Sequence, residues 1–217
     1  MTSARVAATL AALPDAVTAT GFVLVWSSPF VFGPLSVKTA MLTMLVEFFL
    51  VHATGFFNVF AHDSGSKLRR SLCIVGLSSF YLMMISAFAW SFHAWWTLSA
   101  FAWLAVGKII AIWSRSKDDT ASKDDRMFWA MAGWAGSVVL FLGGCVLTSL
   151  LEVPRWGMTA ALQPGFGLDM HSEGIWESQP HRVVAFGALY FGLTALAKLL
   201  SVPFAARKNG QHAPAKG

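Results

Sequence analysis

The sequence predicts an all-α polytopic membrane protein, a bundle of six transmembrane helices with both termini in the cytoplasm. Three observations predict this fold class. Hydrophobic residues make up 56% of the 217 residues, charged residues only 12%, and the mean hydropathy is +0.59. Apolar stretches of about 20 residues, long enough to cross a bilayer, recur along the chain. The Lys and Arg residues concentrate in the connections on one predicted side of the membrane.

Each predicted span ends where Gly, Pro or charged residues interrupt an apolar run. The first span is the weakest, because Thr and Ser residues interrupt it before Gly33-Pro34 ends it. Residues 3–13 precede it, and we expect them to form a helix in the membrane interface ahead of Pro14. We expect one integral membrane domain over residues 1–217, with spans at 15–32, 38–62, 71–92, 94–113, 127–151 and 181–206 and an outer loop at 152–180.

The charge distribution predicts the orientation of the bundle. The side that carries both termini holds Arg5, Lys67, Arg69, Arg70, Arg115, Lys117, Lys123, Arg126, Arg207, Lys208 and Lys216. The other side holds only Lys38, Arg155 and Arg182. Because positively charged loops stay in the cytoplasm, both termini are predicted to be cytoplasmic. The predicted location is a bacterial inner (plasma) membrane, with the protein crossing it several times.

Composition and cysteine placement exclude several other classes of protein. A net charge of +5 would suggest nucleic-acid binding in a soluble protein. Here the basic residues lie in short loops and the C-terminal tail, so we expect the lipid bilayer as partner and no nucleic acid. Cys73 and Cys145 fall near opposite ends of their spans, and we expect no disulfide between them. No clean cleavage site follows the first apolar run, so we expect no cleaved signal peptide.

The second span, 38–62, carries more polar side chains than any other. Ionisable groups at membrane depth are costly and usually functional. At 3.6 residues per turn, the polar residues from Thr43 to His62 share roughly one face, whereas His52 points elsewhere. Lys108 and Lys198 fall at a depth similar to that of His52. The predicted proton, cation or polar relay comprises Glu47, His52, Thr54, Asn58, His62, Asp63, Lys108 and Lys198.

A second interpretation requires no relay. Glu47 is then neutral and hydrogen-bonds across the bundle, while Lys108 and Lys198 extend along their helices to the headgroups. This interpretation explains the lysines well and Glu47 less well.

The outer face suggests an alternative chemistry. His and carboxylate side chains at alternating positions are compatible with zinc or copper. The candidate metal ligands are His93, Asp169, His171, Glu173 and His181. They match no fixed metal motif, and apart from this alternative no cofactor is favoured, although a haem with a single axial histidine is compatible with the sequence. A haem held by two histidines is disfavoured, because only His52 lies at true membrane depth.

The motifs favour a non-enzymatic protein over an enzyme. The sequence contains no G-x-S-x-G nucleophile motif and no Gly-rich phosphate loop in the required context. We therefore expect a proton- or small-solute-coupled transporter or channel subunit, or an accessory subunit of a membrane complex. A chain of 217 residues is small for a transporter, so we expect a homo-oligomer or a larger complex. The alternative is a membrane-embedded metal-dependent enzyme or redox protein with its site at the outer face.

Overall fold

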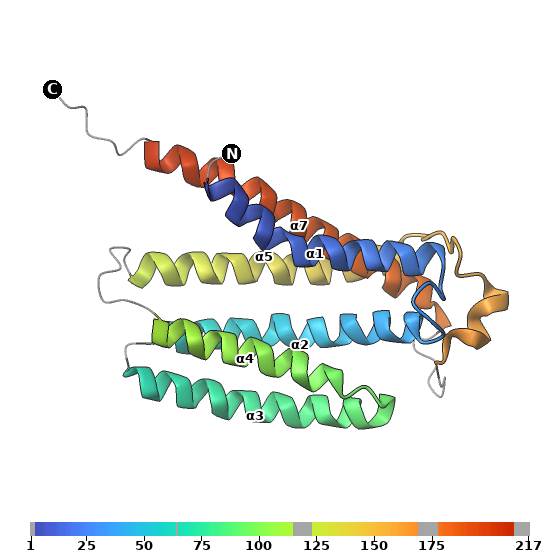
Figure 1. Cartoon of the computed structure of the whole chain (residues 1–217), viewed down its shortest axis with the longest axis horizontal. Helices are drawn as coiled ribbons and strands as arrows, with labels where there is room; N and C mark the ends of the chain where they lie inside the picture. The colour runs from blue at the N-terminus through green and yellow to red at the C-terminus, as the bar shows by residue number, and fades with distance from the viewer. Residues whose placement is uncertain (1–2, 64, 115–122, 169–177, 211–217) are drawn as a thin grey trace. The chain divides into compact units, whose positions relative to one another are not determined.

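The computed structural model describes residues 3–63, 65–114, 123–168 and 178–210. Over these ranges the regular structure is entirely helical, and six helices are long and apolar enough to cross a membrane. The predicted fold class is therefore confirmed, while the side on which the termini lie stays a prediction. The helices in Figure 1 are α1 (Ser3–Ser27), α2 (Ser36–His62), α3 (Lys67–Phe92), α4 (Trp96–Ser114), α5 (Lys123–Leu150) and α7 (Pro180–Gly210), with the 3₁₀-helix η1 (Ala160–Phe166) after α5.

The N-terminal region differs from the prediction. Instead of an interfacial helix and a span at 15–32, α1 continues through Pro14, and its membrane-spanning part is Ala8–Ser27. Proline is tolerated inside membrane helices because neighbouring side chains compensate for the lost backbone bond. The carbonyl that loses its backbone partner is that of Leu10, and the bond from the Thr18 hydroxyl to the Pro14 carbonyl at 2.9 Å is an additional contact within the helix. Asp15 consequently lies within the span rather than at its end.

The turn between α3 and α4 is as tight as its sequence predicts. His93 adopts the left-handed conformation, with φ of 53°. Its N–H donates to the Trp90 carbonyl at 3.3 Å, and the Ala94 N–H donates to the Ala89 carbonyl at 2.9 Å. These two bonds are those of a Schellman motif, which satisfies the last carbonyls of a helix. The motif reverses the chain and places α4 against α3.

By its internal contacts the chain divides into two compact units. Unit 1 comprises Met1–Met41 and Leu142–Gly217, and unit 2 comprises Leu42–Phe141. Helices α2 and α5 contribute residues to both units. The two units are described separately below.

Unit 1 is built on the pairing of α1 with α7 (Figure 1). Phe22 of α1 stacks on Phe191 of α7 with ring centroids 5.7 Å apart. Gly187 makes this approach possible, because a Cβ at that position would overlap the Phe22 ring. The segment that follows α5 contacts the end of α1. There the Trp26 indole N–H donates to the Pro154 carbonyl at 2.9 Å.

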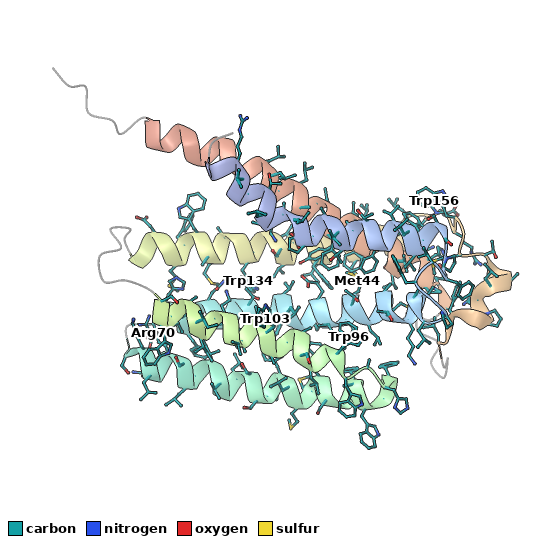
Figure 2. The ribbon with its side chains drawn as sticks, viewed as in Figure 1. Met44, Arg70, Trp96, Trp103, Trp134 and Trp156 are labelled. Atoms are coloured by element: carbon teal, nitrogen blue, oxygen red, sulfur yellow. The ribbon has the colours of Figure 1, made fainter. Side chains whose placement is uncertain are left out.

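Unit 2 is organised around α2, which contacts the other three helices of the unit. Phe49 meets Tyr81 of α3, and Phe57 meets Phe101 of α4, within one cluster of buried side chains. On α5, the Trp134 indole lies against Gly55 and donates its N–H to the Val51 carbonyl at 2.9 Å. Figure 2 labels Trp134 between the ribbons of α5 and α2. Helix α2 is therefore the element on which any site in unit 2 depends.

Candidate functional site

Asn58 is the centre of a polar bridge that joins three helices of unit 2. Its side chain is buried at 5% exposure. The amide oxygen accepts a hydrogen bond from Lys108 Nζ of α4 at 2.8 Å, and the amide nitrogen donates to the Ala130 carbonyl of α5 at 3.2 Å. One side chain of α2 thus holds both α4 and α5. Because a buried amide must be hydrogen-bonded to be tolerated, this arrangement fixes the rotation of all three helices.

Lys108 lies within the membrane-spanning part of α4, six residues before Ser114 at its end. That separation corresponds to about 9 Å along the helix axis. A lysine at the centre of a membrane helix costs about 2.5–3.5 kcal/mol on insertion scales, and the cost is smaller for Lys108 because it lies nearer to one end of α4. The bond to Asn58 offsets part of that free energy, and the partly buried side chain extends across to α2.

Polar and charged side chains also lie at the C-terminal end of α2, next to the polar bridge. His62 is buried, and its Nδ1 atom lies 2.8 Å from the Asn58 carbonyl oxygen one turn earlier. Asp63 forms an ion pair with Arg69, 3.9 Å between Oδ2 and Nε. Arg70, labelled in Figure 2, donates to the Ala61 carbonyl at 3.1 Å. Cations at the C-terminus of a helix stabilise its dipole.

Lys67 and Ser71 of α3 form hydrogen bonds with Trp113, near the end of α4. The Lys67 ammonium donates to the Trp113 carbonyl at 3.2 Å, and the Trp113 indole donates to the Ser71 hydroxyl at 3.1 Å. Side chains in the first turns of α3 therefore form hydrogen bonds with the ends of both α2 and α4. We did not predict these residues as part of a site, although a basic cluster at the start of a helix was visible in the sequence.

Glu47 and Thr54 lie further along α2, towards its N-terminus. Glu47 is partly buried, 11 residues from Asn58, which is about 16 Å along the axis. That spacing excludes direct contact between the two side chains. The Thr54 hydroxyl, between them, donates to the Leu50 carbonyl of its own helix at 2.6 Å. The relay that we predict through these residues stays a prediction.

His52 lies on the exposed side of α2, in agreement with the prediction from helical spacing. Its imidazole contacts the rings of Phe48, Phe56 and Tyr81, with centroid distances of 6.0, 5.5 and 6.1 Å. His52 therefore belongs to an aromatic surface of unit 2 rather than to the polar bridge.

Lys198 belongs to unit 1, where it pairs with Asp15. The Nζ and Oδ2 atoms are 2.5 Å apart, and the side chains are 43% and 16% exposed respectively. Neither interpretation of Lys198 anticipated this partner, because the predicted first span began at Asp15 and treated it as a boundary residue. Extending the helix through Pro14 would have placed Asp15 inside the span.

The outer-face metal hypothesis stays a prediction. Asp169, His171 and Glu173 lie outside the described residues. His93 is exposed at the end of α3 in unit 2, and His181 is buried at the start of α7 in unit 1. Among the described residues, no group of three His, Cys, Asp or Glu side chains is arranged to hold a metal ion.

Comparison with known proteins assigns no family to the chain. No protein-family model, curated protein or solved structure matches it. The functional argument therefore depends on the residues themselves.

Proposed function

We propose that the chain is a subunit of a proton- or small-solute-coupled membrane transport protein. The coupling site of this proposal is the bridge between Lys108 and Asn58. The observation that carries it is the 2.8 Å contact between the Lys108 ammonium and the buried Asn58 amide, within the membrane-spanning parts of α4 and α2. Ionisable groups inside membrane helices are rare and commonly mark ion or solute pathways.

The bridge offers a physical means of coupling. Asn58 connects Lys108 on α4 to the Ala130 carbonyl on α5, so loss of the Lys108 proton would weaken this polar contact between α4 and α2, and a solute that displaces Lys108 would break it. A ligand shifts a conformational equilibrium only by as much as it binds one state better than the other. Here the difference would arise from the Asn58 oxygen, which accepts from Lys108 in one state and from the solute in the other.

The proposal also assigns roles to other residues of the predicted relay. Glu47 is the protonatable group further along α2, and His62 and Asp63 provide the exit at the other end. In this arrangement both termini are cytoplasmic and the membrane is a bacterial inner membrane. The subunit operates as a homo-oligomer or within a larger complex.

The test is proton flux into liposomes that contain the purified protein and a trapped pH-sensitive dye. A potassium diffusion potential drives the flux. We expect Lys108→Met and Asn58→Leu each to reduce the flux about tenfold or more, because a hydrogen bond to a charged group contributes about 1.5–3 kcal/mol. Lys108→Arg should retain part of it. Lys38→Met, which removes a charge at the start of α2, is the control with unchanged flux.

Two outcomes would overturn the proposal. Flux no greater than that of empty liposomes would exclude proton coupling by this chain alone. Wild-type flux in Lys108→Met would show that protons cross elsewhere, and Glu47→Gln would then test the remaining part of the relay.

A further inference from the structure

One side of α2 in unit 2 presents a continuous aromatic surface. Phe48, His52, Phe56 and Val59 are all exposed, and their spacing of four, four and three residues places them on one stripe of the helix. Phe48 and Phe56 are 42% and 48% exposed. We call these four residues the His52 face. His52 is the one residue of the four with a polar side chain.

The polar atoms of His52 are not satisfied within the described part of the chain. Its ring makes aromatic contacts with Phe48, Phe56 and Tyr81, and no described residue forms a hydrogen bond with either ring nitrogen. His52 lies ten residues before His62, about 15 Å from that end of the membrane helix. At that depth lipid tails offer neither a donor nor an acceptor. An imidazole that faces them loses the hydrogen bonds it would make in water, which is unfavourable.

We propose that the His52 face forms a twofold interface with a second copy of the chain, in which His52 contacts His52 of the partner subunit. A neutral imidazole has one donor and one acceptor, so two of them satisfy each other through an N–H···N bond. In a twofold interface each surface meets its own copy, and a residue near the axis meets itself. A second copy thus supplies the missing partner without any additional residue type.

The apolar members of the face fit the same interface. Phe48 and Phe56 lie one turn on either side of His52, and each side chain is partly exposed; the Phe48 ring also contacts Phe141 of α5 at a centroid distance of 6.0 Å. Helix association in membranes depends on close packing of such side chains together with hydrogen bonds between helices. The inference does not rest on the proposed transport activity, and it gives His52 a role in assembly instead of in the relay.

The test is disulfide cross-linking of the full chain in lipid bilayers. The background carries Cys73→Ala and Cys145→Ala, so that each variant has a single cysteine. We expect Phe48→Cys or Phe56→Cys to form a covalent dimer efficiently. The matched control is Trp103→Cys, which is 79% exposed on α4 of the same unit and should stay monomeric.

A second measurement isolates His52. In the Phe56→Cys background, His52→Leu should weaken dimerisation about three- to tenfold, the range expected for one hydrogen bond between membrane helices. His52→Asn keeps a donor and an acceptor and should restore part of the loss. His52→Leu retains an apolar side chain between the two Phe residues, so we expect the fold of the monomer to be unaffected.

Several results would overturn the inference. Cross-linking of Trp103→Cys as efficient as that of Phe56→Cys would indicate random collision. A chain that stays monomeric by mass measurement and is not cross-linked at either Phe position would exclude the interface. An optical spectrum with a haem band that His52→Leu abolishes would show that a haem, not the partner imidazole, occupies the face.

Discussion

At Gly55, the absence of a side chain on α2 allows the Trp134 indole of α5 to approach. A Cβ at Gly55 would lie 2.5 Å from the Trp134 Cε2 atom, well inside van der Waals contact. The indole cannot move away easily, because its N–H is bonded to the Val51 carbonyl at 2.9 Å. The contact lies one helical turn from Asn58, so it also helps to position the polar bridge.

We predict that Gly55→Ala destabilises the protein by about 1–3 kcal/mol, the usual cost of overpacking a well-packed site. The reason is the displaced Trp134 ring, and the effect should exceed the gain of about 1 kcal/mol that alanine gives a helix. The measurement is unfolding in detergent followed by circular dichroism. Gly76→Ala on α3 is the control, because a Cβ there meets nothing within 4 Å. Equal stability of the two variants would contradict the prediction.

The pairing of α1 with α7 depends on a polar contact as well as on packing. Asp15 and Lys198 meet at 2.5 Å within two helices that are otherwise joined by apolar side chains such as Phe22 and Phe191. Lys198 lies two residues before Leu200, the end of the membrane-spanning part of α7. Because the side chains of Lys198 and Asp15 are 43% and 16% exposed, the ion pair is neither fully buried nor fully exposed.

We predict that Lys198→Met and Asp15→Asn each destabilise unit 1 by about 1–2 kcal/mol, between the values for exposed and buried ion pairs. The exchange of the two residues, Asp15→Lys with Lys198→Asp, should recover part of the loss because the attraction is restored. Thermal unfolding in detergent measures each effect. Thr20→Val on α1 is the control, because within the described part of the chain the Thr20 hydroxyl bonds only the Ala16 carbonyl of its own helix. If the double variant loses as much stability as the two single losses added together, the predicted pairing of the two side chains is wrong.

For the whole molecule, we predict that both termini lie on one side of the membrane, as they would if all six candidate spans of the described residues cross it. The positive-inside rule then predicts which side, from the Lys and Arg residues of the connections. Asp125, near the start of α5, and Thr159, after its end, are both exposed and lie at opposite ends of one span.

We predict that a cysteine at Thr159 reacts with an impermeant maleimide added to intact cells, whereas a cysteine at Asp125 reacts only after the membrane is opened. The physical reason is that positively charged loops remain in the cytoplasm. The background again lacks Cys73 and Cys145. The reverse pattern would show that the bundle has the opposite orientation, and labelling of both cysteines from outside would show that α5 does not cross.

The sequence by itself determined the class of fold and, except for the first, the approximate positions of the six candidate membrane helices of the described residues. Hydropathy averaged over about 20 residues is a local property, and a bilayer selects for it directly. The same holds for the orientation of His52 away from Asn58, which follows from helical periodicity. The main local error, at α1, arose because Pro14 would end many helices in water but is tolerated in a membrane helix.

Only the tertiary structure decided which polar groups meet. Lys108 and Asn58 are 50 residues apart in the chain, and Trp134 and Val51 are 83 apart. Lys198 was grouped with the relay by depth alone, yet it contacts Asp15 in the other unit. The depth of a residue follows from its place in a span, but its partner depends on how each helix is rotated and packed, which is set by close contacts such as Trp134 on Gly55.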